Sequence, residues 1–209
     1  MYKGPQTILS VNRKTGCSID LPIAHHCRPT RNCARACYAK RGPQAWPLPA
    51  RKHAWLSTYL SGSDISRLIK ECQNRSSVRL SGSGDLLAAH VPNLIRLADA
   101  CHETRFWGMT RKTEIARAIN KPALPNLRIL VTVDSTSPKR TWDFPGTLCY
   151  GPRHPQDQVP SDSRILTVFP AHYSGKIQSG VPRDPRDCPA VRHDVSGCLV
   201  CGRCFSWWV

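Results

Sequence analysis

The sequence predicts an α/β fold with a mainly parallel sheet, arranged like a partial (βα) barrel and followed by a small cysteine-rich metal module. Short apolar segments alternate with amphipathic segments through residues 78–169, which is typical of βαβ units and hence of parallel strands. Polar side chains follow most of the apolar segments, where parallel α/β folds bind their ligands. Four cysteines cluster near the C-terminus. We therefore expect an α/β domain over residues 1–174 and a four-cysteine metal-binding module over residues 175–209.

Composition limits the class of protein. The chain has 209 residues, of which 40% are hydrophobic, which suits one core plus a small module and argues against a disordered chain. No apolar run approaches the ~18 residues that span a bilayer, and the N-terminus lacks the apolar core of a signal peptide. We therefore expect a cytoplasmic protein with no membrane partner. The net charge of +16 favours nucleic acid as the partner, because excess positive charge attracts polyanions.

The N-terminal residues predict two extended segments. Thr7–Val11 has the pattern of a short strand, and Ser18–Ile23 is apolar and extended. The second segment leads directly to His25, His26 and Cys27. This extended segment is therefore followed directly by histidine and cysteine side chains, which commonly bind metals.

Three cysteines follow, Cys27, Cys33 and Cys37, with the spacing C-x5-C-x3-C. In a reducing cytoplasm, clustered cysteines are more often metal ligands than disulfide partners. Three thiolates are one ligand short of a closed tetrahedral site, so either another residue completes the site or one coordination position stays open for a substrate. The residues that could supply a fourth ligand are Cys17, His25 and His26.

Basic residues surround this cysteine loop. Residues 27–52 contain seven Lys and Arg residues and no Asp or Glu. A local excess of positive charge is the expected footprint of phosphate contacts. The residues expected to bind nucleic acid are Arg28, Arg31, Arg35, Lys40 and Arg41.

Helical and extended patterns then alternate along the chain. A helical segment at His53–Leu60 precedes an amphipathic helix that begins after Ser63-Asp64, a good N-cap pair, and places Cys72 on its apolar face. The next helix is expected from Pro92 to Cys101, with both cysteines acting as small buried residues. Strands are predicted at residues 78–80, 106–109, 127–133, 148–150 and 164–169, and a short helix at residues 113–119.

The ends of these strands carry the polar side chains. Gly82 and Gly84 flank Ser83 and precede Asp85. Glycine allows the backbone to approach a ligand closely, and a carboxylate can bind an ammonium group or ribose hydroxyls. The other polar residues at strand ends are Ser81, Thr110, Arg111, Lys112, Asp134, Ser135 and His172.

The C-terminal cysteines form the strongest motif. Residues 175–187 are rich in Gly, Pro and charge and predict a linker. The cysteines after it have the spacing C-x9-C-x2-C-x2-C and supply four sulfurs, which fit zinc or a cubane cluster. The contiguous C-x2-C-x2-C run is more typical of a [4Fe–4S] cluster, so iron–sulfur is favoured over zinc. The four ligands are Cys188, Cys198, Cys201 and Cys204.

Several of these motifs together resemble a family of phage and mobile-element proteins called the gene product eighty-eight family. The resemblance spans residues 17–205 and rests on Cys27…Cys33…Cys37-Tyr38-Ala39, on Ser81-Gly82-Ser83-Gly84-Asp85, on Trp107-Gly-Met-Thr110-Arg111-Lys112 and on the C-terminal cysteines. The order of motifs is also distantly similar to that of radical S-adenosylmethionine enzymes. Their usual cysteine spacing is C-x3-C-x2-C, whereas this chain has C-x5-C-x3-C.

The second resemblance implies specific roles. Cys27, Cys33 and Cys37 would ligate three irons of a [4Fe–4S] cluster, and S-adenosylmethionine would bind the fourth iron. The C-terminal cysteines would hold an auxiliary cluster, giving one or two [4Fe–4S] clusters in all. The cofactor's amino group would lie near Ser83 and Asp85, and its carboxylate or ribose near Thr110 and Arg111.

These observations lead us to expect an iron–sulfur protein of phage or mobile-element origin, of radical type, acting on nucleic acid or another anionic substrate. One alternative is a non-catalytic nucleic-acid-binding protein stabilised by zinc or by iron–sulfur clusters. Another is a phage-encoded protein that binds a host protein. Charge favours the first alternative, and the open three-thiolate site favours the enzyme.

Overall fold

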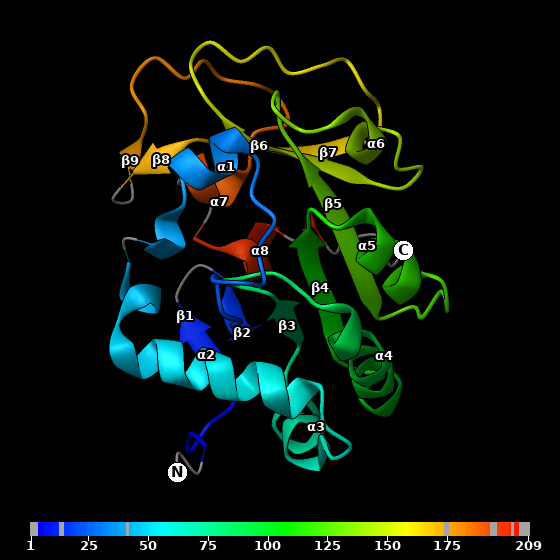
Figure 1. The fold of residues 1–209 in the computed structure, drawn as a ribbon. Helices are drawn as coiled ribbons and strands as arrows, with labels where there is room; N and C mark the ends of the chain where they lie inside the picture. The colour runs from blue at the N-terminus through cyan, green and yellow to red at the C-terminus, as the bar shows by residue number, and fades with distance from the viewer. Residues whose placement is uncertain are drawn as a thin grey trace.

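The computed structural model describes residues 4–12, 15–40, 42–173, 176–192, 196–201 and 203–204. Its centre is a seven-stranded sheet in which the strands lie in sequence order from β1 to β7 (Figure 1). β1 pairs with β2 antiparallel, and every other neighbouring pair in this sheet is parallel. The α/β class and the mainly parallel sheet are therefore confirmed. The strands are β1 (Ser10–Asn12), β2 (Gly16–Ile19), β3 (Ser77–Leu80), β4 (Arg105–Thr110), β5 (Leu127–Val133), β6 (Leu148–Arg153) and β7 (Ile165–Pro170), with β8 (His172–Tyr173) and β9 (Lys176–Ile177) pairing separately.

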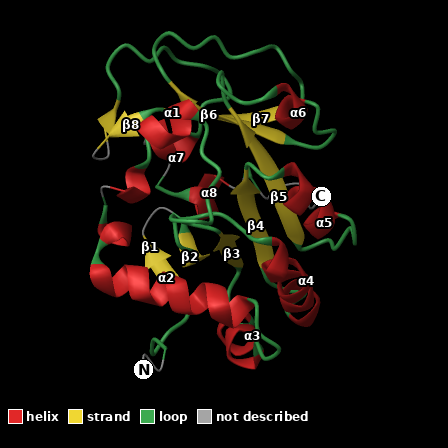
Figure 2. Cartoon of the chain, viewed as in Figure 1, coloured by secondary structure: helices red, strands yellow, loops and turns green. Residues whose placement is uncertain are grey.

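Apart from β6 and β7, which a loop joins, neighbouring parallel strands are connected by helices, as Figure 2 shows. None of those in the described part of the chain combines the length and apolarity of a membrane-spanning segment. The α-helices are α1 (Arg31–Arg35), α2 (Pro47–Leu60), α3 (Ser66–Cys72), α4 (Val91–Ala100), α5 (Thr113–Asn120), α6 (Lys139–Trp142), α7 (Pro189–Arg192) and α8 (Cys198–Cys201), and short 3₁₀ turns form at Tyr38–Lys40, Pro43–Ala45 and Ala88–His90.

One face of the sheet packs against helices α2 to α5. Strand residues such as Val78, Phe106 and Ile129 share a single apolar core with Leu56 of α2 and Leu97 of α4. Successive residues of a strand point to opposite faces of the sheet, so core residues on this face recur at every second position along each strand. Burial of these apolar residues between the sheet and the helices provides most of the hydrophobic stabilisation.

The other face of the sheet is more polar and lies beneath the C-terminal segment. Arg79 on β3 pairs in register with Trp107 on β4, and its guanidinium lies 5.3 Å from the indole ring centroid. Cys149 on β6 is fully buried and points to this same face, opposite in register to Thr132. A second, smaller apolar cluster contains Cys188 and neighbours in α7, packed against the end of β7.

Several boundaries differ from the sequence prediction, and two of these differences have a clear physical reason. The strand expected at Thr7–Val11 is wrong for its first residues, because the amides of Ile8 and Leu9 donate to the carboxylate of Glu71 instead of to a neighbouring strand. The helix expected from His53 begins six residues earlier, at Pro47, since proline suits the first helical turn. The predicted burial of Cys72 and Cys101 is confirmed.

Candidate functional site

The cysteine loop leaves β2 and crosses the carboxyl end of β3. The amide of Leu21 donates to the carbonyl of Ser83 at 3.0 Å, and the amide of Gly82 donates to the carbonyl of Ile19 at 3.0 Å. A Cβ added at Gly84, where φ is +70°, would lie 2.3 Å from the carbonyl of Leu21. The glycines expected to admit a ligand therefore admit the start of the cysteine loop.

The short helix α1 fixes the middle of this loop to the end of β5. Thr30 is its N-cap: the hydroxyl accepts the amide of Cys33 at 3.2 Å and donates to the carboxylate of Asp134. The side-chain amide of Asn32 donates to Ser135 at 2.9 Å. An N-cap that is itself held by a buried carboxylate places Cys33 at the carboxyl edge of the sheet.

The three thiols of the loop share this edge. Burial raises the pKa of Cys27 to about 12, with smaller contributions from the charges of Asp85, Cys33 and Cys37. These groups are therefore close enough to interact electrostatically. Within the described ranges, however, no three Cys, His, Asp or Glu side chains form a group ready to hold a metal ion. The thiols are gathered at the edge of the sheet without a formed cage of ligands.

The donor set fits a soft metal or an iron–sulfur cluster. Thiolates are the ligands that zinc and iron–sulfur centres prefer. With a pKa of about 12, the thiol of Cys27 is protonated at neutral pH, so metal binding would have to expel this proton.

Asp85 is the acidic residue whose charge acts on the thiol of Cys27, and it is buried with 6% of its surface exposed. Its Oδ1 accepts the hydroxyl of Thr110 at 2.6 Å and the amide of Leu86 at 2.8 Å. Burial raises its pKa, and the hydrogen bond from Thr110 and the charge of Lys112 oppose this shift. Asp85 and Thr110, two of the residues expected to bind a cofactor, are thus in direct contact.

The other two predicted cofactor residues have structural partners. The hydroxyl of Ser83 donates to the carbonyl of Leu21 at 3.2 Å. The guanidinium of Arg111 lies 3.0 Å from the buried carboxylate of Asp134 and donates to the carbonyl of Gly151 at 2.7 Å. Arg111 therefore joins the ends of β4, β5 and β6, and it also lines a cavity.

This cavity of ≈ 560 Å³ lies beside the cysteine loop. Four cationic side chains and one carboxylate line it, together with several hydroxyl groups. Its volume is in the range typical of small-molecule sites. The lining residues are Arg28, Pro29, Thr30, Arg111, Lys112, Thr113, Glu114, Thr132, Thr136, Ser137, Pro138, Arg140 and Thr141.

His26 is part of a buried hydrogen-bond chain. Ser57 Oγ lies 3.2 Å from Nε2 of both His26 and His90. Nδ1 of His90 accepts the amide of Leu87, so neutral His90 carries its proton on Nε2 and donates to Ser57. Ser57 in turn donates to Nε2 of His26, whose Nδ1 donates to the carbonyl of Asp85 at 3.3 Å. Both ring nitrogens of His26 are therefore used.

The other two candidates for a fourth ligand are Cys17 and His25. Cys17 packs against the helix-side core and interacts electrostatically with Cys72. His25 is exposed, with a φ of 64°. Among the described residues, neither forms a metal-binding group with the three thiols.

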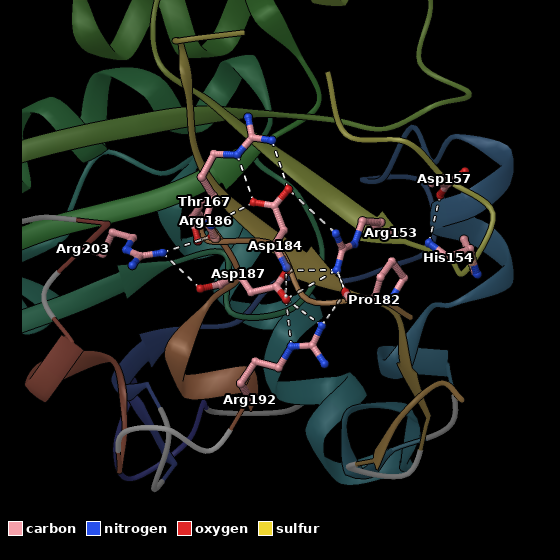
Figure 3. Close-up of polar contacts among 10 residues, drawn as sticks. All are labelled: Arg153, His154, Asp157, Thr167, Pro182, Asp184, Arg186, Asp187, Arg192 and Arg203. Carbon is pink, nitrogen blue, oxygen red and sulfur yellow. Dashed lines mark hydrogen bonds and ion pairs between the residues drawn. The ribbon is translucent and has the colours of Figure 1, made fainter. Parts of the chain in front are cut away.

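A buried charge network holds the segment before the C-terminal cysteines (Figure 3). Asp187 lies 3.3 Å from the guanidinium of Arg153 and 2.6 Å from that of Arg192. Arg203 donates to the carbonyls of Arg186 and Asp187, each at 3.0 Å. The network thus ties the segment before the cysteine motif to the end of β6 and to Arg192 and Arg203 within the motif.

The sequence did not indicate that Cys149 belongs with the C-terminal cysteines. Burial raises the pKa of Cys204, and the nearby thiols of Cys149, Cys188 and Cys198 raise it further. The sequence feature that could have revealed this is the alternation along β6, where Cys149 points to the face of the sheet opposite to Leu148 and Tyr150. This feature becomes useful only when the segment that covers that opposite face is known.

The basic residues of the loop are exposed. Arg28 forms an exposed ion pair with Glu114 at 3.2 Å, while Arg31, Arg35 and Lys40 are exposed. Arg41 lies outside the described residues. The predicted cations are thus accessible to a polyanion.

A family model described as Gene product 88 matches residues 3–206. No curated protein and no solved structure matches the chain.

Proposed function

The chain belongs to the Gene product 88 family, and we propose that it binds an iron–sulfur cluster through Cys27, Cys33 and Cys37. The observation that carries the proposal is the gathering of these thiols, with Asp85, at the carboxyl edge of a parallel sheet. This is the edge at which α/β folds bind ligands. The engagement of both nitrogens of His26 supports a site with one open coordination position.

We further propose a radical-type reaction with S-adenosylmethionine in a sheet that forms a partial barrel. The sequential strand order supports the barrel. When bound, a cluster with an open iron supplies the electron that cleaves this cofactor. Asp85 would bind the cofactor's ammonium group, with Thr110 orienting the carboxylate of Asp85. Arg111 would present positive charge to the carboxylate or ribose from the cavity wall.

The C-terminal cysteines Cys188, Cys198, Cys201 and Cys204 would hold a second cluster or a zinc ion in a small metal module. Electrostatic contact among the thiols of Cys188, Cys198 and Cys204 supports this assignment. Both metal sites would suit a reducing cytoplasm, where thiols stay free.

The test begins with purification without oxygen, followed by measurement of iron, sulfide and zinc and by an absorption spectrum. We expect iron and sulfide, with less iron in Cys33→Ser. Cys101→Ser is the matched control, because Cys101 is buried in the helix-side core. Stoichiometric zinc in a colourless protein without iron would overturn the cluster proposal.

The reaction is tested separately by adding dithionite and S-adenosylmethionine and measuring 5′-deoxyadenosine. We expect formation by the wild-type protein and loss in Asp85→Asn at unchanged iron content. Asparagine keeps the acceptor for Thr110 and removes the charge. Iron without 5′-deoxyadenosine would leave a structural or redox role for the cluster.

The exposed cations around the loop favour the alternative of a non-catalytic nucleic-acid-binding protein. That function predicts zinc in both cysteine groups together with nucleic-acid binding. Because both functions predict nucleic-acid binding, metal content and 5′-deoxyadenosine formation are the measurements that distinguish them.

A further inference from the structure

An unusual group of apolar side chains is exposed just after the cysteine loop. The exposed fractions are 45% for Tyr38, 63% for Trp46 and 69% for Leu48. Val11 is the other large apolar residue exposed to this degree in the described part of the chain. Grouped exposed aromatic residues usually mark a binding surface, because their burial on binding is favourable.

Basic residues flank these aromatic residues in the sequence, and the turn that contains Tyr38 contacts the turn that precedes Trp46. Arg35, Lys40 and Arg51 are exposed, and residues 27–52 contain no acidic residue. We call Arg35, Tyr38, Lys40, Trp46 and Arg51 the aromatic–basic surface. Its charge is complementary to a polyanion, and its aromatic rings would pack against flat groups of that partner.

Local hydrogen bonds hold the side chain of Tyr38 and the backbone of Trp46. The hydroxyl of Tyr38 donates to the carbonyl of Gly82, and burial raises the pKa of this hydroxyl. The tip of the side chain is thus anchored while its ring is open to solvent. Trp46 lies between the turn Pro43–Ala45 and α2: its amide donates to Pro43 and its carbonyl accepts from Ala50. The anchored ring of Tyr38 and the fixed backbone of Trp46 reduce the conformational entropy lost on binding.

We propose that the aromatic–basic surface binds single-stranded nucleic acid, with bases stacked on Tyr38 and Trp46 and phosphates at Arg35, Lys40 and Arg51. Only unpaired bases offer both faces for stacking, whereas a duplex hides them. This deepens the proposed function by naming the substrate class, and it rests on that function only for the chemistry after binding. Tyr38 interacts electrostatically with Cys37 and Cys27, so a bound strand lies next to the three-thiol loop.

The test measures anisotropy of a labelled oligothymidylate, an oligouridylate and a duplex of equal length, titrated with the full chain. We expect both single strands to bind more tightly than the duplex. We expect Trp46→Ala and Tyr38→Ala each to weaken single-strand binding by about 5- to 150-fold. Trp46→Phe and Tyr38→Phe should retain most of the affinity, because each keeps an aromatic face.

Two matched controls separate stacking from general effects. Leu48→Ala removes an equally exposed apolar side chain that has no aromatic face, and we expect little change. Lys121→Ala removes an exposed charge after α5, outside the surface, and should also leave affinity nearly unchanged. Melting curves for each variant confirm that these exposed substitutions leave the protein folded.

Salt dependence tests the phosphate contacts. Three such contacts predict a slope of about −2 for log Kobs against log salt concentration with single strands, and Lys40→Ala should reduce its magnitude by about 0.7. Equal affinity for duplex and single strand, or unchanged affinity in Trp46→Ala, would overturn the proposal. Iron content is a separate readout, so failure of the cluster proposal and failure of this one are distinguishable.

Discussion

Ser57 illustrates how single residues organise the candidate site. Its hydroxyl is the link between two buried histidines that come from different parts of the chain, His26 before the thiol of Cys27 and His90 before α4. Each side chain in this series of hydrogen bonds donates one bond and accepts one, so the partners of each ring nitrogen decide whether it carries a proton. These hydrogen bonds attach the start of the cysteine loop to the helix side of the molecule.

We expect Ser57→Ala to lower the free energy of unfolding by about 1–3 kcal/mol, because the buried Nε2–H of His90 loses its acceptor. Urea unfolding checks this value. Thr58→Ala is the control: Thr58 is exposed and bonds only within its own helix, so a change of less than about 0.5 kcal/mol is expected. Equal effects of the two substitutions would contradict the hydrogen-bond chain.

His90 should make stability depend on pH. Burial foremost, and then the charge of His26, lowers the pKa of His90 from 6.5 to about 4. Between pH 6.5 and 4 the unfolded state binds more protons, so stability falls as pH falls through this window, by up to about 3 kcal/mol. Urea unfolding at intervals from pH 7 to 4 measures this loss.

His90→Gln serves as the comparison for this pH profile, because glutamine does not titrate. The variant is expected to be less stable at neutral pH, but its stability difference from the wild-type protein should narrow as the pH falls. Parallel profiles for the two proteins would exclude His90 as the source.

At the scale of elements, the segment around Asp187 acts as an extra partner for β7. Asp187 forms an isolated parallel bridge with Val168, and its carboxylate is 6% exposed between the guanidinium groups of Arg153 and Arg192. The amide of Cys188 donates to the carbonyl of Val168 at 2.7 Å. The segment expected to be a linker therefore positions the first cysteine of the C-terminal motif.

We expect Asp187→Asn to cost about 3–5 kcal/mol, since it leaves Arg153 buried without its neutralising charge. Chemical unfolding measures the loss. Glu114→Gln breaks an ion pair in which both side chains are mostly exposed, and a cost below about 1 kcal/mol is expected. A small effect of Asp187→Asn would mean that Asp184, which also approaches Arg153, suffices.

At the scale of the whole molecule, the two cysteine groups occupy different environments. Cys27, Cys33 and Cys37 lie at the carboxyl edge of the sheet, beside the cavity. The C-terminal thiols lie against the polar face, where Cys149 of β6 joins them. The first group thus borders a cavity, and the second lies between the C-terminal segment and the sheet.

This difference predicts unequal effects of removing one thiol from each group. With metal bound, Cys201→Ser should lower the melting temperature more than Cys33→Ser, because metal binding to the C-terminal group contributes to folding. Cys33→Ser should instead remove iron from the loop with most of the fold retained. Melting curves and iron content of the two variants check this, and the reverse order of stability would contradict it.

The sequence allowed the fold class and most strands to be predicted, because these depend on local periodicity. The strand Leu127–Val133 is rich in branched apolar residues, and its bounds are as predicted. The same reasoning could not find the hydrogen bonds of Ser57 or the role of Glu71, since each partner lies more than 30 residues away. It also could not show that the glycines after β3 face the cysteine loop.

The sequence by itself determined the α/β class, the family and the two cysteine motifs, because periodicity and spacing are local properties. Only the tertiary structure decided which of these residues meet. It brought Asp85 to Cys27, placed Cys149 with the C-terminal thiols and turned His26 toward Ser57. The physical reason is that contacts across the sheet depend on strand order and register, which bring together residues that the chain keeps far apart.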